Sequence, residues 1–588
     1  MGKLLRLFVL APALAAALSY EINFVGLKDP QALKAMFDVS DLVVLQDRPP
    51  PSINGLRYRI ASDVPELLKV LRAYGYYDAV ITSDIDSRKE VLQVYLLIQP
   101  GPQYTLASYQ VYQADACTEI AALPNCCTFT PECLGLEVGK PALASSIVNA
   151  ELQLLSELAR CGYPLASVEK RRVEVDMAEK DVKAASCIRG GPLSRFGPTT
   201  IFGLSAVQPA FVQRRIRWNE GEIYNPEEVE ETQKKLLNSD LFSSVMVTHG
   251  DQLDSEGQLP MKMRITEAST RQFSIGVYYA TVDGPGVSLN WIHRNVRGMG
   301  EIVSLDTDIS KRYIAGVLTY KILDFWVMDQ TYRAMAEAAR ENIHPYLAFS
   351  YRGANYLERK IDSKRSISAG FKIEHINVSE SASNGTYLLI GMPFFGKYST
   401  AENPLDPVSG YSIVYQATPY QSLFHANQRF FDQRLTGTLY IPVVPSKFLV
   451  LALRTQFGSI AGTKQKNVPL TKLFLGGSED ELRGYRYKTV SPLNGRGQSL
   501  GGRSAIYISV ETRLRFSKTI GVVPFADFGT VTFNELPQVH AKWFKSVGLG
   551  LRYFSFFGPL RVDVGFPLDR RKGIDSFYQL YASVGQAF

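Results

Sequence analysis

The stretch "AIYISVETRLRF" at residues 505–516 alternates between two kinds of side chain along its whole length. Because successive side chains of a β-strand point to opposite faces, this alternation predicts a strand with one apolar and one polar face. Such a strand either lines the core of a soluble sandwich or turns its apolar face to lipid. The apolar side holds Ile506, Ile508, Val510, Thr512, Leu514 and Phe516, and the polar side holds Ala505, Tyr507, Ser509, Glu511, Arg513 and Arg515.

The same alternation continues on both sides of this stretch, from about residue 270 to Phe588. About sixteen segments of roughly 10 to 13 residues fit there, which is the length that a tilted strand needs to cross a bilayer. The number and length of the segments favour lipid over a sandwich core. We therefore predict an all-β transmembrane barrel of about 16 strands over residues 269–588.

The N-terminal residues 1–19 have the pattern of a secretory signal peptide. Lys3 and Arg6 precede the apolar run "LFVLAPALAAALS", and small residues suited to cleavage follow. The run is shorter than the ~20 residues that a transmembrane helix requires. An exported membrane protein without long apolar helices is expected to be a barrel.

Residues 20–268 contain three copies of one plan: a strand, helices, a turn and two more strands. The copies span 20–100, 101–190 and 191–268, so an α+β part precedes the barrel. In the first copy the helix turns at Gly75, and in the second at Gly162. The sheet edges of such small domains can accept an extended peptide, or the domains can act as spacers, and the sequence leaves both readings open.

Six cysteines fall within the N-terminal half of the chain, all of them in the second copy. Their clustering in an exported protein predicts disulfides, with the connectivity open, although the adjacent pair Cys126–Cys127 is not expected to bond to itself. A CxxC pair is missing, so we expect no metal site. The cysteines are Cys117, Cys126, Cys127, Cys133, Cys161 and Cys187.

The composition excludes several classes of function. The 64 basic and 57 acidic residues are dispersed, and no basic stripe points to nucleic acid. The six histidines are scattered, and neither HExxH nor GxSxG occurs. We therefore expect neither an enzyme nor a bound cofactor.

Four motifs in a fixed order resemble the Omp85 superfamily of outer-membrane β-barrel proteins. They are "WIHRNVRGMGE" at 291–301, "FLGGSEDELRGY" at 474–485, "FADFG" at 525–529 and "YASVGQAF" at 581–588. The resemblance covers nearly the whole mature chain. It implies that the three repeats are POTRA domains in the periplasm, the second of them cysteine-rich, and that the barrel lies in the bacterial outer membrane.

The number of repeats resembles one branch of the superfamily, the TamA subunit of the translocation and assembly module. This implies unfolded outer-membrane proteins such as autotransporters as substrates, a periplasm-spanning partner of the TamB type, and outer-membrane lipid as a further cargo. A BamA-like general β-barrel insertase is the alternative. A passive porin, the alternative from another class, explains the barrel but neither the repeats nor the loop signature.

The resemblance also implies site residues. In the superfamily the signature loop folds into the lumen, where its arginine meets acids on the wall. The corresponding latch here is Leu482, Arg483, Gly484 and Tyr485, and alternation places the candidate partners Glu511 and Asp527 on the luminal face. The first and last strands are expected to pair poorly, so that the barrel opens there sideways. The expected seam residues are Gly276, Gly585 and Phe588.

Overall fold

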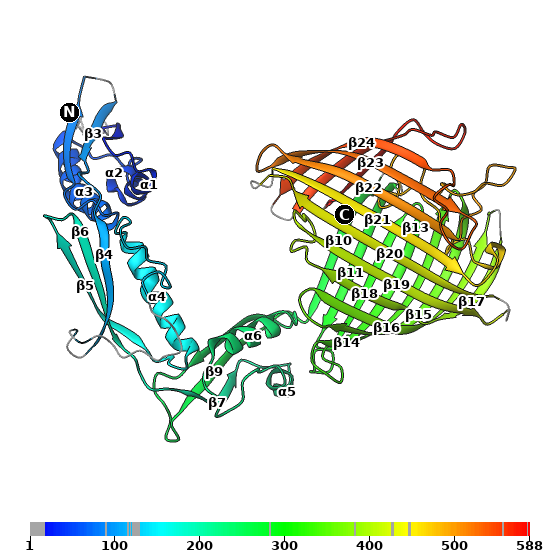
Figure 1. Ribbon diagram of the computed structural model, residues 1–588, viewed down its shortest axis with the longest axis horizontal. Helices are drawn as coiled ribbons and strands as arrows, with labels where there is room; N and C mark the ends of the chain where they lie inside the picture. Colours follow the sequence, from blue (N-terminus) through cyan, green and yellow to red (C-terminus); the bar gives the residue numbers. More distant parts are fainter. Residues whose placement is uncertain are drawn as a thin grey trace, which may run out of the picture. The chain divides into compact units, whose positions relative to one another are not determined.

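The computed structural model describes residues 18–88, 91–114, 117, 119, 130–280, 284–381, 384–424, 428–444, 448–555, 558–584 and 586–588. Most of the predicted signal peptide lies outside these residues. The chain divides into two compact units (Figure 1). The second unit consists of Gly203–Arg215, Lys235–Val245 and Arg264–Phe588, and the first contains the preceding and intervening segments. No helix among the described residues is long and apolar enough to cross a membrane.

Each of the three repeats contains a three-stranded sheet, in the orders β1-β3-β2, β4-β6-β5 and β7-β9-β8. In the first two sheets the middle strand runs parallel to one neighbour and antiparallel to the other. The exact domain boundaries remain predictions. The strands are β1 (Tyr20–Val25), β2 (Val80–Asp86), β3 (Leu92–Gln99), β4 (Thr105–Gln113), β5 (Ser167–Asp176), β6 (Asp181–Arg189), β7 (Arg195–Phe202), β8 (Phe242–His249) and β9 (Gln258–Glu267).

The helices of the repeats begin where the sequence supplies a cap. Asp29 accepts backbone N–H bonds at the start of α1, and Asn225 accepts one from Glu227 at the start of α6. The apolar faces of α3 and α4 cover their sheets and form the cores of the first two repeats. The helices are α1 (Pro30–Val39), α2 (Asp41–Val44), α3 (Ile53–Ala73), α4 (Ala144–Arg160), α5 (Pro209–Gln213) and α6 (Pro226–Leu237).

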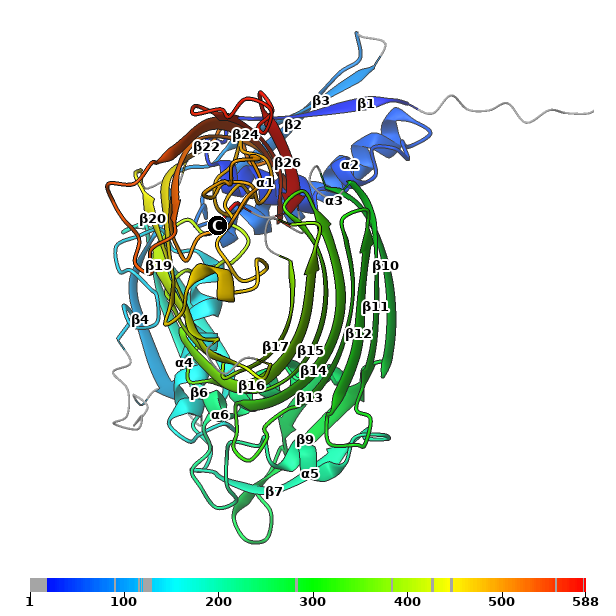
Figure 2. The same ribbon diagram turned by 90° about the vertical axis from the view of Figure 1, so that its right-hand side faces the viewer.

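Residues from 271 onward form one antiparallel sheet of 17 strands in sequence order, which confirms the predicted fold class. Figure 2 looks along the ring that these strands form. The strands are β10 (Arg271–Ala280), β11 (Gly284–Arg294), β12 (Ile302–Ser310), β13 (Tyr313–Ile322), β14 (Gln330–Ile343), β15 (Tyr346–Lys360), β16 (Arg365–Ser379), β17 (Gly385–Gly391), β18 (Phe394–Ser399), β19 (Gly410–Ser422), β20 (Arg429–Pro442), β21 (Leu449–Ala461), β22 (Ser504–Arg515), β23 (Ile520–Thr532), β24 (Phe544–Ser555), β25 (Gly558–Pro567) and β26 (Gln579–Val584).

The described sheet has sixteen strand positions, because β17 and β18 share one position between β16 and β19. The interruption falls at Met392 and Pro393. A proline has no N–H to donate to the ladder, so the pairing breaks there although its register continues on both sides.

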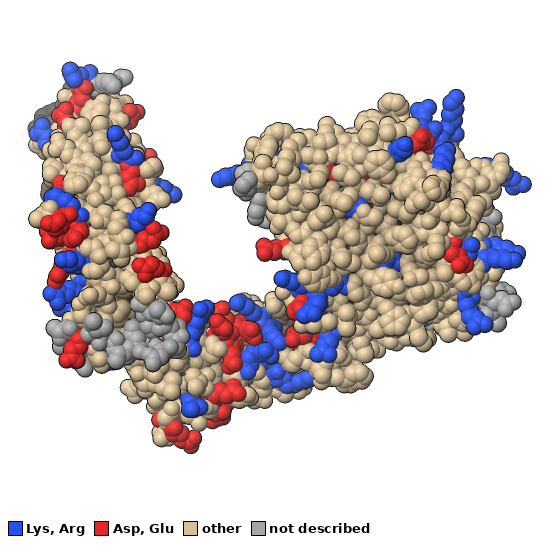
Figure 3. All heavy atoms as spheres, viewed as in Figure 1, with Lys and Arg blue, Asp and Glu red and all other residues tan. Residues whose placement is uncertain are grey.

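The two faces of the barrel wall carry different side chains. Apolar residues on its outer face are exposed, for example Ile413, Leu435 and Leu549, and Figure 3 shows charged atoms gathering at the ends of the barrel. Part of the interior, however, is apolar rather than polar. Residues of the segment between β21 and β22, such as Leu473 and Leu482, pack against the inner wall and form a hydrophobic core inside the ring.

Candidate functional site

The segment between β21 and β22, residues 462–503, lies inside the ring of strands (Figure 2). Its described part contains one short regular element, the 3-10 helix η1 (Gln465–Asn467). The predicted signature occupies its middle. Leu482 and Arg483 are both 0% exposed, and Arg483 is among the largest fully buried side chains in the described chain.

The guanidinium group of Arg483 is surrounded by three carboxylates of the inner wall. Its Nε and Nη2 atoms donate to the two oxygens of Asp527 at 2.7 and 2.8 Å. Its Nη1 atom donates to Glu511 at 2.8 Å and to Asp563 at 3.1 Å. The two-pronged contact with Asp527 uses the planar fork that distinguishes arginine from lysine. The structure thus brings both predicted partners together with Arg483.

Asp563, on β25, is a partner that the sequence reasoning missed. The alternation in "LRVDVGF" places Asp563 on the same face as Arg561 and Gly565, so a search of every luminal carboxylate would have found it. The carboxylates differ in their other contacts. Glu511 also accepts from Arg513 at 3.0 Å, and Asp563 also pairs with Arg552. Among the described residues, the carboxylate of Asp527 accepts hydrogen bonds only from Arg483. Two come from the guanidinium group and one from the backbone N–H of Arg483.

The residues after Arg483 fit the loop closely to the wall. Gly484 has a φ of +91°, and a Cβ atom there would lie 3.1 Å from backbone atoms of Phe566 and Pro567. Its N–H donates to the hydroxyl of Tyr581 at 2.9 Å. The Tyr485 hydroxyl donates to the carbonyl of Lys545 at 2.7 Å. Glycine is therefore required by both the backbone conformation and the close approach.

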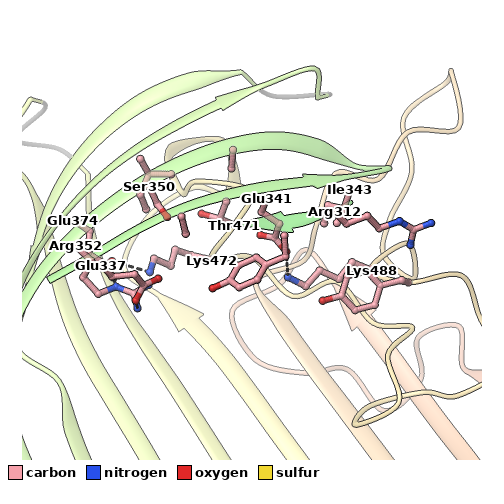
Figure 4. A pocket seen from close by; sticks show the side chains of 15 residues that line it. Arg312, Glu337, Glu341, Ile343, Ser350, Arg352, Glu374, Thr471, Lys472 and Lys488 are labelled. Carbon is pink, nitrogen blue, oxygen red and sulfur yellow. Dashed lines mark hydrogen bonds and ion pairs between the residues drawn. The ribbon is translucent and has the colours of Figure 1, made fainter. Parts of the chain in front are cut away.

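The same loop is also held on the opposite part of the wall, at a cavity of about 370 Å³ (Figure 4). Lys488 donates to Glu341 of β14 at 2.7 Å, and Lys472 lies 2.7 Å from Glu374 of β16. Glu374 is 1% exposed and also accepts from Arg352 at 2.6 Å. The loop therefore bridges the lumen between two groups of strands, and charged contacts on both sides of the lumen fix its position.

The two end strands of the sheet, β10 and β26, lie close together but share no ladder among the described residues. β26 has six residues and β10 has ten. Gly276 lies in β10 opposite Ser288 of β11, and Gly585 lies outside the described residues. The backbone groups on the outer edge of β10 therefore have no described strand to pair with.

Phe588 was expected at this seam, but the structure places it elsewhere. Its ring stacks on Tyr440 at 6.4 Å, and its carbonyl oxygen accepts from Arg513 at 2.6 Å. The guanidinium group of Arg454 lies 4.6 Å from the same ring. Residues 586–588 thus leave the line of β26 for the inside of the ring, where basic luminal side chains hold them (Figure 2).

The motif at 291–301 consists of the last residues of β11 and the compact connection to β12. Asn295 accepts a bond from Gly300, and Glu301 accepts bonds from the N–H groups of Arg297 and Met299. A Cβ atom at Gly300 would lie 2.4 Å from the ring of Phe211, so this glycine lets the connection pack on α5. The motif is therefore a structural support for the segment that contains α5.

Glu267, at the end of β9, holds the start of the same segment. Its carboxylate accepts bonds from the N–H groups of Ser205, Ala206 and Val207. Burial acts to raise the pKa of Glu267, but these N–H groups outweigh it and hold the pKa below the ordinary value of 4.5.

The cysteines of the second repeat are partly paired. Cys117 and Cys187 form a disulfide across 70 residues of sequence, and Cys161 is also disulfide-bonded. Cys133, predicted as a candidate for a disulfide, is free and exposed. Cys126 and Cys127 lie outside the described residues.

Comparisons with known proteins agree with this architecture. Residues 272–588 match the Omp85 superfamily domain, and residues 194–268 match a POTRA domain described as a surface antigen variable number repeat. The chain is 22% identical over 549 residues to the outer membrane protein assembly factor BamA of Nitratidesulfovibrio vulgaris, covering 88% of this chain and 66% of that protein. It is 21% identical to BamA of Neorickettsia risticii, covering 64% of this chain and 53% of that one. The chain thus spans less than two thirds of the length of these relatives.

Among solved structures, the chain resembles BamA from Haemophilus ducreyi lacking POTRA domains 1–3. The TM-score is 0.66 at 16% identity, covering 81% of this chain and 99% of that one. This likeness concerns the fold. Because the matched domain spans more than half of the chain and its barrel and POTRA repeat are both present, the protein belongs to the Omp85 superfamily of outer-membrane β-barrel proteins, with its N-terminal part in the periplasm.

Proposed function

We propose that this protein is an assembly factor that inserts unfolded β-barrel proteins into the outer membrane, in the manner implied by the name of its BamA relatives. The observation that carries the proposal is the edge of β10, which no described strand pairs. An unpaired edge is a template for an incoming strand, because its N–H and C=O groups can extend the sheet. The proposed activity requires no covalent chemistry.

The outer face of β10 supports this role. Phe273, Ile275 and Val277 are 63%, 64% and 81% exposed, so the strand that would receive a substrate faces lipid. The latched loop supports it in another way. Because the loop and its hydrophobic core fill part of the lumen, the passage of an incoming strand sideways at the seam is favoured over passage through the pore.

A seam lock tests the proposal. Cysteine pairs are introduced along β10 and β26, and the purified full chain is reconstituted in liposomes with an unfolded barrel substrate. We expect oxidation to stop substrate folding and reduction to restore it. The control is a cysteine pair at Ser274 and Asn290, which lie opposite each other in the β10–β11 ladder and leave the seam free. Full activity with the β10–β26 pair oxidised would refute the proposal.

A TamA-type role with a TamB-type periplasmic partner is the second candidate. It is favoured by the three sheets that precede the barrel. Co-purification of a periplasm-spanning protein that depends on residues 20–100 would support this role. Insertion activity of the chain alone, unchanged by removal of those residues, would favour the BamA-like role.

A further inference from the structure

An apolar groove of about 490 Å³ lies on the outer face of the barrel wall, near the middle of the strand order between β10 and β26. It is lined by residues of β16, β17, β19, β20 and β21. These strands are neighbours in the wall (Figure 1). The side chains that matter for the argument are Phe371, Met392, Pro419, Phe431, Ala461 and Arg429. The groove is separate from the arginine latch and from the seam.

The register of the strands shows how the hollow arises. Pro419 lies opposite Phe431, and Phe431 lies opposite Ala461, so these three side chains share the outer face. The side chain of Ala461 is small and Gly462 has none, which leaves space beside the ring of Phe431. On the other side, Phe371 and Met392 are 41% and 54% exposed and form the opposite wall.

The sheet is also less continuous here than elsewhere. Pro393 accepts a bond from the N–H of Gly370 and Pro419 accepts one from Met392, but neither proline can donate in return. Each of the two prolines therefore leaves a gap in the hydrogen bonds between its strand and the neighbouring strand, and the sheet under the groove is weakened. The groove is therefore built mainly from strand residues, with Met392 and Gly462 directly after the ends of β17 and β21.

One end of the groove carries a single positive charge. Arg429 is exposed, begins β20 and lies opposite Gln421 on the outer face. This end is the one at which β21 leads into the luminal loop. The outer wall of a membrane barrel is covered by lipid, so an apolar hollow with a cation at its end matches an acyl chain with a phosphate head.

We propose that this groove is a binding site for a membrane lipid with a net negative phosphate head, with one acyl chain between Phe371 and Phe431 and the phosphate on Arg429. The inner face of the same strands contacts the luminal loop. Tyr420 and Phe430 stack at 4.8 Å and belong to the hydrophobic core that contains Leu473 of the loop. A lipid in the groove therefore stabilises the part of the wall against which the loop packs.

The test uses the full chain in nanodiscs that contain phosphatidylglycerol or phosphatidylcholine, each with a photoreactive group in its acyl chain. Cross-linked peptides are mapped by mass spectrometry. We expect cross-links to concentrate on residues 390–392, 419–421 and 429–431. We also expect phosphatidylglycerol to be preferred about five-fold, which corresponds to about 1 kcal/mol for one basic side chain. Excess lipid A as a competitor shows whether a phosphorylated glycolipid takes the same site.

Two variants separate the groove from the charge. Ala461→Trp fills the hollow and is expected to abolish the concentrated cross-links, whereas Ala336→Trp, on the outer face of β14 opposite Leu318, leaves them unchanged. Arg429→Gln is expected to remove the preference for phosphatidylglycerol, whereas Arg340→Gln keeps it. Arg340 is an arginine of β14 outside the groove, beside the exposed ring of Phe349. Cross-links spread evenly over the outer wall, or unchanged in Ala461→Trp, would overturn the proposal.

Discussion

Replacing Arg483 by methionine removes the charge of the latch while keeping a long side chain. The side-chain bonds of Arg483 lie between 2.7 and 3.1 Å, and the residue is 0% exposed. Breaking one partner of a buried ion pair costs about 3–5 kcal/mol. A sum over all the bonds would overestimate the loss, because Glu511 keeps Arg513 and Asp563 keeps Arg552 as partners.

The loss of stability therefore arises mainly at Asp527, because among the described residues only Arg483 donates side-chain hydrogen bonds to its carboxylate. Neutralising that carboxylate removes the charge left without a partner. We expect Asp527→Asn to recover about 1–3 kcal/mol in the Arg483→Met background, which is the range for a buried group left unsatisfied. Glu511→Gln in the same background is expected to recover nothing.

The assay is guanidinium unfolding of the full chain in detergent, followed by tryptophan fluorescence, together with the temperature at which heat-modifiable gel mobility is lost. A loss of 3–5 kcal/mol lowers the folding equilibrium constant by about two to four orders of magnitude. Arg483→Lys is the matched control. It keeps the charge but not the fork, so its stability is expected to lie between the wild type and Arg483→Met. Equal stability of Arg483→Met and wild type, or recovery by Glu511→Gln rather than Asp527→Asn, would refute this reasoning.

Three further predictions concern other parts of the chain. Lys488→Met removes the bond to Glu341 and is expected to cost about 1–3 kcal/mol in the same unfolding assay and to speed proteolysis of the luminal loop; an unchanged cleavage rate would contradict the second attachment. Because the pKa of Glu267 is lowered in the folded protein, its stabilising effect is present above pH 4.5 and is lost as the pH falls below it. Glu267→Gln should remove this acid-dependent increase in proteolysis of residues 203–215, and a pH profile identical to wild type would refute it. Serine at both Cys117 and Cys187 is expected to destabilise the second repeat by about 2–5 kcal/mol without changing barrel heat-modifiability, as measured by limited proteolysis with and without reductant.

The sequence predicts the barrel well because a two-residue period is a local property. Each strand of an antiparallel sheet reveals its two faces in its own residues, as in the alternation around Glu511. The role of Arg483 came from the resemblance to the Omp85 superfamily, whereas its partners Glu511 and Asp527 followed from the period, since both can be assigned to the luminal face without knowing which strands are neighbours. Asp563 obeys the same rule, but choosing it requires knowing that β25 comes close enough to the loop.

The features that differ from expectation depend on contacts between distant segments. The apolar core of the lumen forms because Tyr346 and Leu473, far apart in sequence, meet inside the ring. The position of Phe588 depends on Tyr440 and Arg513, which no local pattern links to it. The break at Pro393 is different, because it has a local signal: a proline has no N–H to donate to the neighbouring strand.

The residues of the latch are close together in the sequence, which bears on the order in which the barrel folds. Arg483 and its three carboxylate partners lie between residues 483 and 563, with sequence separations of 28, 44 and 80. Contacts over short separations close smaller loops and form sooner than those that join the ends of a chain. We expect β22 to β25 and the signature loop to form an early folding nucleus, onto which the strands from β10 to β20 are added. The residue that holds the finished loop in place would thus also organise the first strands of the barrel.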